Sequence, residues 1–243
     1  MQIKSEDQAW VILGRYIDGK PIERPIFEGG PSMSISIRGE DYLASITVGQ
    51  MEAYLEFQST INRAFAALAK GHFDARYLTN AEEEELTLRT EVKEGSSIFE
   101  TDLSPLVQAL SSSLGTANPT ELIVGGVIIC LALTSPLLVK YFFEGRAKEL
   151  ELKNTSVLIH ALANKSVEDT KRLALYERAL GEISKKFPSL SGLMPQLKRA
   201  QLSLLSSLED ADSATINGVD IEQDQIQDLN NRRPRSAKKI QDL

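Results

Sequence analysis

The hydrophobic segment Leu122–Val139 is 18 residues long and contains no charged residue. Crossing the ~30 Å hydrocarbon core of a bilayer takes roughly 20 residues, with a range of about 17–25. Lys140 follows the segment and can reach toward water, while Tyr141–Phe143 suit a membrane interface. The pattern therefore predicts a hydrophobic, membrane-spanning helix within residues 119–143.

A proline inside this segment supports a second interpretation. Thr134-Ser135-Pro136 would kink or break a helix, because proline lacks the amide hydrogen and clashes with the preceding turn. The resulting pieces, 122–133 and 137–143, are each too short to span a bilayer and would suit a buried core helix or helical pair. Membrane helices tolerate proline, especially beside serine or threonine, so both interpretations remain open.

Before this segment, residues 1–118 have the mixed pattern of an α+β domain. Ala9–Ile17 is rich in aromatic and branched residues and is followed by Asp18-Gly19, which favours a strand and a turn. In Met33–Ile37 apolar residues alternate with serines, the period-two pattern of a half-buried strand. A short return strand is expected at Tyr42–Ile46.

The clearest helix of this domain is expected over residues 48–70. One apolar stripe with a three-to-four-residue spacing indicates a helix packed on the domain core, and Gly71 is a natural stop. The acidic run Glu82–Glu85 is expected to be solvated, because consecutive carboxylates do not converge on one calcium ion. The stripe consists of Tyr54, Phe57, Ile61, Phe65 and Leu68.

A β-hairpin is expected over residues 86–103. Apolar and polar residues alternate up to Lys93, Glu94-Gly95-Ser96 forms a turn, and Ser97–Leu103 returns. Ser104-Pro105 then suits the start of a helix.

The hairpin sequence LTLRTEVKEGSSIFETDL precedes a short helix and a glycine-containing hydrophobic segment. This strand–EGSS–strand arrangement, over residues 86–143, resembles a loose group of uncharacterised bacterial and prophage proteins. The resemblance implies a bacterial or phage source. It transfers no functional residue.

The region after the hydrophobic segment is predicted to be all-α over residues 144–209. Its three amphipathic helices are expected at Arg146–Ala163, from a capping box at Ser166 to Pro188, and at Pro195–Leu208. Together they would form a small bundle or an oligomerising stalk.

Residues 210–243 are expected to be a partly disordered tail. Within it, Thr215–Ile221 contains Asn217-Gly218 and could form a small hairpin. Five basic residues lie between Arg232 and Lys239, and a solvated tail is favoured over a lipid or nucleic-acid site.

The composition and charge are those of a folded, acidic protein. Hydrophobic residues make up 42% and charged residues 25%, so wholesale disorder is not expected. The net charge of −7 argues against nucleic acid as a partner. Residues 1–121 hold 10 Lys/Arg and 19 Asp/Glu, whereas the chain from Lys140 onward holds 17 and 15.

The expected topology contains a conflict. The N-terminus has no signal-peptide pattern, which places the first domain in the cytoplasm. The cations after the segment, Lys140, Arg146, Lys148 and Lys153, favour a cytoplasmic C-terminal side. The two arguments agree if the segment is re-entrant or interfacial, or if it lies outside a membrane.

The residues that carry chemistry are scarce. The only cysteine, Cys130, lies within the hydrophobic segment, and the two histidines, His72 and His160, have no partners at a zinc-site spacing. No nucleotide-binding glycine motif or nucleophile elbow occurs. We therefore predict no catalytic, cofactor-binding or metal site, and no enzyme.

These patterns favour a membrane-localised, non-enzymatic protein that binds a partner or oligomerises. The expected partners are a lipid bilayer and further copies of the chain. One alternative is a soluble oligomeric scaffold whose hydrophobic helix is buried at a subunit interface, and a second is an enzyme with an atypical site.

Overall fold

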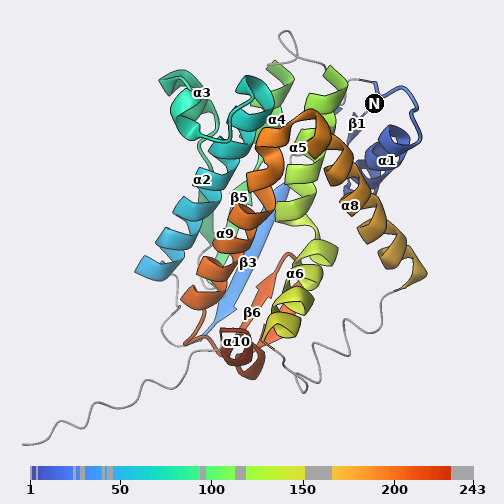
Figure 1. Cartoon of the computed structure of the whole chain (residues 1–243). Helices are drawn as coiled ribbons and strands as arrows, with labels where there is room; N and C mark the ends of the chain where they lie inside the picture. The colour runs from blue at the N-terminus through green and yellow to red at the C-terminus, as the bar shows by residue number, and fades with distance from the viewer. Residues whose placement is uncertain are drawn as a thin grey trace, which may run out of the picture.

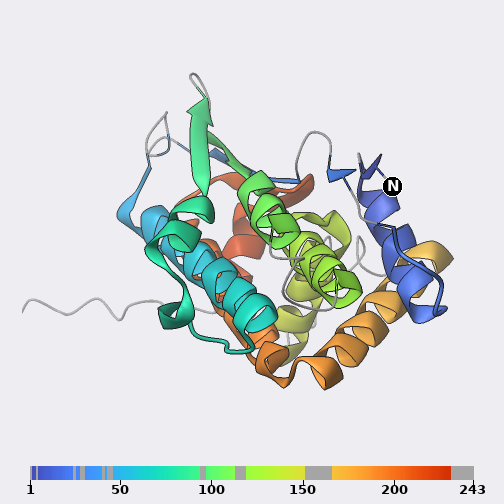
Figure 2. The same ribbon diagram turned by 90° about the horizontal axis from the view of Figure 1, so that it is seen from above.

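The computed structural model describes residues 2–3, 5–23, 26–27, 31–39, 42, 46–93, 97–112, 119–150 and 166–230. Within this part, the chain forms a five-stranded antiparallel sheet and a layer of helices packed against one face of it (Figures 1 and 2). The mixed α+β composition predicted from the sequence is confirmed.

The strand order of this sheet is β4-β5-β3-β6-β7, and two short strands, β1 and β2, pair separately in parallel. The strands are β1 (Gln2–Ile3), β2 (Ile26–Phe27), β3 (Ser32–Arg38), β4 (Arg89–Lys93), β5 (Ser97–Asp102), β6 (Ser213–Ile216) and β7 (Val219–Glu222). The α-helices are α1 (Glu6–Ile17), α2 (Val48–Lys70), α3 (Asn80–Glu85), α4 (Ser104–Ser112), α5 (Pro119–Thr134), α6 (Pro136–Glu149), α8 (Val167–Lys186), α9 (Leu193–Ser207) and α10 (Gln223–Asn230). Two 3-10 turns lie at Ala75–Tyr77 and Pro188–Gly192.

Strand β3 is the centre of the sheet and confirms the predicted alternation. Met33, Ile35 and Ile37 are buried against the helices, while the serines between them are half-buried on the other face. The predicted hairpin is also present as β4 and β5, with Thr90 opposite Thr101. Its first strand begins at Arg89 rather than Leu86. The turn residues 94–96 lie outside the described part of the chain.

Helix α1 corrects the strand predicted at Ala9–Ile17. Its buried residues Ala9, Trp10, Ile12 and Leu13 lie on one helical face, which packs against α5 and α8. A preference of aromatic and branched residues for strands is weak compared with the burial of such a face. Of the expected return strand 42–46, Tyr42 and Ile46 are described and neither lies in a strand.

Helix α2 confirms the predicted helix 48–70, with Thr47 and Gln50 forming a capping box and Gly71 ending it at φ 77°. The acidic run expected to be solvated forms most of α3, and Glu83, Glu84 and Glu85 are exposed there as predicted. Helix α3 begins with a second capping box between Thr79 and Glu82. The side-chain oxygens at these starts satisfy amide hydrogens that the first turn leaves unpaired.

The hydrophobic segment is broken at Ser135 into α5 and α6, whose axes bend by 67°. Every residue of α5 from Glu121 to Leu133 is buried within the chain, against α1, α2, α4, α8 and β3. No single helix in the described ranges is long and apolar enough to cross a membrane; α5 and α6 together pass that test by length and composition only.

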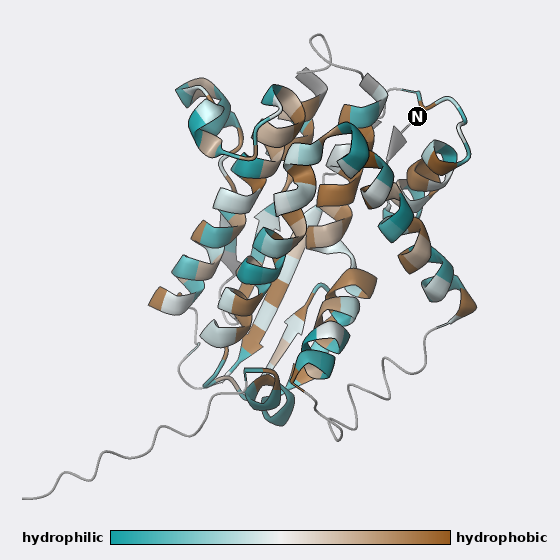
Figure 3. Cartoon of the chain, in the orientation of Figure 1, coloured by the Kyte–Doolittle hydropathy of each residue, from teal (hydrophilic) through white to brown (hydrophobic). Residues whose placement is uncertain are grey.

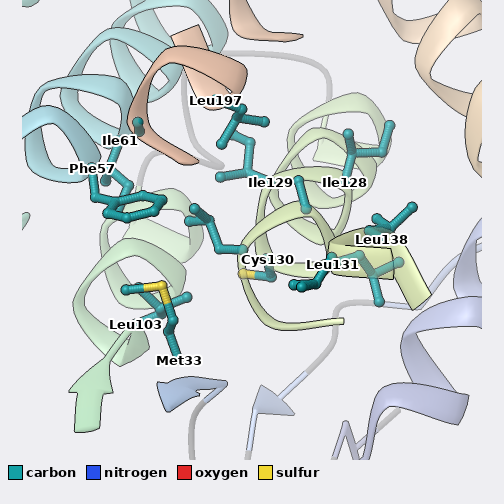
Figure 4. Packing of buried hydrophobic residues seen from close by; sticks show 14 of the residues in the cluster. Met33, Phe57, Ile61, Leu103, Ile128, Ile129, Cys130, Leu131, Leu138 and Leu197 are labelled. Carbon is teal, nitrogen blue, oxygen red and sulfur yellow. The ribbon is translucent and has the colours of Figure 1, made fainter. Parts of the chain in front are cut away.

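The core of the molecule forms around α5. In Figure 4, Phe57 and Ile61 of α2 and Leu197 of α9 surround residues of α5. Two glycines allow this close packing, because a Cβ at Gly125 would lie 2.4 Å from Leu68 Cδ2. A Cβ at Gly126 would lie 2.6 Å from a Leu110 methyl carbon.

The C-terminal part of the chain completes the sheet that begins in the N-terminal part. Strand β6 pairs with β3, with Thr215 opposite Ser36, and the turn to β7 contains Asn217 and Gly218 at φ 48° and 78°. The predicted small hairpin is therefore confirmed, but it does not belong to a disordered tail, because residues 213–230 form β6, β7 and α10. The sequence pattern predicts the hairpin but not its pairing with the distant strand β3.

Two of the three predicted C-terminal helices are confirmed. Helix α8 begins with the capping box of Ser166 and Asp169, and α9 corresponds to the helix expected at Pro195–Leu208. The first one, Arg146–Ala163, is described only to the end of α6, because residues 151–165 lie outside the described part. The basic cluster at 232–239 also lies outside it.

Candidate functional site: a cleft between helices α6, α8 and α9

A partly open cleft with a cavity volume of about 270 Å³ lies among the described residues. Residues of α6 and α9 form its walls, and Ala132 of α5 and Tyr176 of α8 contribute to its floor. Helices α6 and α9 are far apart in the sequence, yet residues of both line this one hollow. We call this hollow the α6–α9 cleft.

Apolar side chains line part of the cleft. They come from α6 through Leu138 and Phe142 and from α9 through Met194 and Leu197. Figure 3 shows the origin of this character, because α6 is hydrophobic where it begins and hydrophilic toward its end. Gly145 leaves additional space, since a Cβ built there would meet no atom within 4 Å.

Charged side chains lie at the polar end of α6 and the facing side of α9. The Lys198 ammonium donates to Glu149 Oε1, and this hydrogen bond, together with the nearby Arg146 guanidinium, lowers the pKa of Glu149. Arg146 Nη1 lies 3.6 Å from Glu149 Oε2, and Lys148 Nζ lies 2.9 Å from Glu144 Oε1. The polar end therefore holds two groups of ion pairs, one around Glu149 and one between Lys148 and Glu144.

Arg146 is held from a second direction. Its Nε donates a 3.1 Å hydrogen bond to the carbonyl oxygen of Leu229 at the end of α10. This bond fixes the guanidinium beside the cleft, and it uses an Nε hydrogen rather than the two Nη groups. The Nη groups therefore face the Glu149 side.

Two tyrosines add hydroxyl groups to the lining. Tyr141 Oη donates to Glu177 Oε1 at 2.7 Å, and this bond raises the pKa of the phenol. Tyr176 is buried, which raises its pKa, and its hydroxyl donates to the carbonyl oxygen of Ile128 at 3.4 Å. Both phenols therefore stay neutral at physiological pH.

The position of α6 depends on the joint after α5. Ser135 Oγ donates a 2.6 Å hydrogen bond to Glu6 Oε1, which also accepts from Trp10 Nε1 at 2.9 Å. On the other side of the joint, Asn217 Nδ2 donates to the Leu133 carbonyl oxygen at 2.7 Å. Contacts from α1 and from the β6–β7 turn thus hold the bend that directs α6 along the cleft.

The residues singled out in the sequence for possible chemistry do not meet at this cleft. Cys130 is buried in the core, where desolvation raises its thiol pKa to about 12. His72 stacks on Tyr77 with a ring separation of 4.0 Å, and His160 lies outside the described residues. In the described ranges, no three His, Cys, Asp or Glu side chains are grouped so that they could hold a metal ion.

In the sequence, Tyr141–Phe143 predict a membrane interface, and Arg146 and Lys148 are a topology signal. The sequence pattern could not predict the cleft, because the opposite wall comes from Met194–Gln201, far along the chain. The feature of the sequence that points to the cleft is the change along α6 from apolar to charged residues. Comparison with protein-family models, curated proteins and solved structures found no match to this chain.

Proposed function

We propose that this chain is a non-enzymatic binding protein that holds a small, largely apolar molecule in the α6–α9 cleft. The observation that carries the proposal is the cavity of about 270 Å³ with an apolar interior and a polar end. Ligand sites commonly combine an apolar lining with a few polar groups, in volumes of ~300–1,000 Å³. The present volume is slightly smaller and suits a small ligand.

The lining chemistry favours binding over catalysis. A nucleophile is usually activated by a neighbouring base within hydrogen-bond reach. In the cleft, Lys148 and Lys198 are paired with carboxylates. The neutral hydroxyl groups of Tyr141 and Tyr176 donate to Glu177 and to the Ile128 carbonyl oxygen, and their oxygens can accept from a ligand. These groups can orient a ligand through hydrogen bonds and charge.

Two glycines give a matched test of this proposal. Gly145 lies in the cleft lining and Gly181 lies on α8 away from it, and a Cβ added at either position would meet no atom within 4 Å. Gly145→Phe should fill the cleft, whereas Gly181→Phe should add a surface ring only. Each variant replaces a helical glycine, so the effects on helix propensity are similar.

The probe is 1-octanol, titrated into the full chain while methyl chemical shifts are followed by NMR. Saturable shifts are expected for the natural chain and for Gly181→Phe, with at least tenfold weaker binding for Gly145→Phe. Absence of saturable binding by octanol and by octanoate would overturn the proposal, and so would equal octanol binding by the two folded variants. Circular dichroism spectra verify that both variants fold.

Membrane association is a second candidate, favoured by the combined length and composition of α5 and α6. In that function the chain would associate with a bilayer through this bent pair, with the N-terminal part on the cytoplasmic side. Fractionation followed by an alkaline carbonate wash tests it. Retention in the washed membranes would support an integral anchor, and release would contradict it.

The bacterial or phage source and the self-association of the chain also stay predictions. Self-association is tested by the molar mass of the purified chain in light scattering. A mass of one chain over a wide concentration range would contradict it.

A further inference from the structure

The charges at the polar end of the α6–α9 cleft are unevenly matched. Three cations line the cleft, Arg146, Lys148 and Lys198, against two carboxylates, Glu144 and Glu149. Lys148 pairs with Glu144, so Glu149 faces both remaining cations. A further carboxylate, Glu177 on α8, accepts from Tyr141, which lies about one and a half helical turns before Arg146 on α6.

The ion pair between Arg146 and Glu149 leaves room for a closer partner of the guanidinium. The 3.6 Å separation of Arg146 Nη1 and Glu149 Oε2 is longer than an ordinary N–H···O hydrogen bond of 2.7–3.2 Å. Guanidinium groups bind carboxylates best through two parallel, shorter hydrogen bonds. A second carboxylate could therefore approach Arg146 without displacing its bond to Leu229.

The other pair can also exchange partners. The side chains of Lys198 and Glu149 are 43% and 45% exposed, and ion pairs this exposed contribute little to folding stability. Lys198 can therefore turn toward an incoming anion at little cost to the fold. Its ammonium carries three donors, enough for Glu149 and a ligand oxygen together.

The apolar part of the cleft begins beside these ion pairs. Leu138 and Arg146 are eight residues apart on α6, so about 12 Å of helix axis separates the apolar end from the cationic end. At ~30 Å³ for each water-sized group, a volume of about 270 Å³ has room for about nine such groups. This corresponds to one short alkyl chain with a polar end.

On these grounds we infer that the ligand is a medium-chain monocarboxylate, whose acid group binds Lys198 and Arg146 and whose alkyl chain packs along Leu138, Phe142 and Leu197. The inference rests on the proposed binding function and specifies its ligand. Charge selects the acid end, and the apolar walls between α6 and α9 select the alkyl chain.

Three probes of the same chain length separate the contribution of the end group from that of the alkyl chain. Octanoate, 1-octanol and octylammonium are titrated at pH 7 into the natural chain, with dissociation constants measured by NMR. Octanoate is expected to bind at least tenfold more tightly than octanol, and octylammonium more weakly than either. This order follows from the excess of cations at the polar end.

The variant Lys198→Met removes one cation while keeping an unbranched side chain. Its octanoate affinity should fall to within about threefold of its octanol affinity. The matched control is Lys185→Met, because Lys185 is also exposed and ion-paired, with Glu182 on α8, away from the cleft. That control should keep the natural preference for octanoate.

The outcomes distinguish the inference from the proposed function. Equal binding of octanoate and octanol by the natural chain, or tighter binding of octylammonium, would overturn the carboxylate inference and leave a binding cleft. An undiminished octanoate preference in Lys198→Met together with Arg146→Met would also overturn it. Failure of octanoate and octanol alike to bind would overturn both.

Discussion

The side-chain amide of Asn217 donates a 2.7 Å hydrogen bond to the carbonyl oxygen of Leu133, near the C-terminal end of the apolar helix α5. The same side chain accepts a 2.9 Å bond from the backbone amide of Ser34 through its Oδ1. One turn residue therefore connects the last helix turn of the hydrophobic segment to the central strand. The last carbonyls of a helix lack helical partners, and Asn217 supplies one.

Replacing Asn217 by aspartate should destabilise the fold. Aspartate keeps an acceptor for Ser34 but loses the donor to Leu133, and leaves two oxygens facing each other. The expected loss in the free energy of unfolding is about 1–3 kcal/mol. Urea denaturation measures it, with Glu222→Gln on the exposed side of β7 as a control that should change little. A loss equal to that of the control would contradict the role of this bond.

The bond between Ser135 and Glu6 should be seen as an energetic coupling. Ser135→Ala and Glu6→Ala each remove the 2.6 Å hydrogen bond that joins α1 to the α5–α6 joint. A double-mutant cycle should yield a coupling of about 0.5–3 kcal/mol, because the two groups are in direct contact.

The control cycle combines Ser135→Ala with Asp7→Ala, since Asp7 pairs with Arg172 instead. The effects of Ser135→Ala and Asp7→Ala on the free energy of unfolding should be additive. Additive effects in the Glu6 cycle as well would contradict a direct contribution of this bond to stability.

Gly125→Ala should destabilise the core by about 1–3 kcal/mol, because the new methyl group would overlap the Leu68 side chain. Gly181→Ala is the matched control, since its first side-chain carbon meets no atom within 4 Å. The control should be neutral or stabilised by up to ~1 kcal/mol through improved helix propensity. Thermal unfolding of both variants tests the prediction, and equal midpoints would contradict it.

The start of α3 should contribute to acid sensitivity through Glu82. A hydrogen bond from Lys70 and one from the Thr79 backbone amide lower the pKa of Glu82. A carboxyl group with a lowered folded-state pKa adds stability above its unfolded pKa of about 4.3 and loses it as the pH falls through the folded value. Glu82→Gln should remove this part of the pH dependence.

Urea midpoints of the natural chain and Glu82→Gln, compared from pH 6 to pH 2.5, measure this effect. The difference between them should be largest at pH 6 and should shrink below about pH 4.3. Glu83→Gln is the control on the same helix, and should leave the slope unchanged. A constant difference across the range would contradict the pKa shift of Glu82.

The local elements were largely predictable from the sequence. The alternation around Ile35, the stripe of α2 ending at Gly71, and the capping box at Ser166 all predicted elements that the structure confirms. These signals depend on neighbouring residues, because side-chain period and end-capping act within a few turns. The strand predicted at Ala9–Ile17 is wrong because distant contacts decide the structure of this segment. Its burial against α5 and α8 favours a helix.

The hydrophobic segment shows what the sequence determined by itself and what only the tertiary structure decided. The sequence alone determined that Leu122–Val139 is apolar and that Pro136 can break it, because proline lacks the amide hydrogen that a helix interior needs. The tertiary structure decided the burial of α5 within the chain, the pairing of β6 with β3, and the cleft between α6 and α9. Those features join residues that are dozens of positions apart, and such contacts depend on packing that no local pattern encodes.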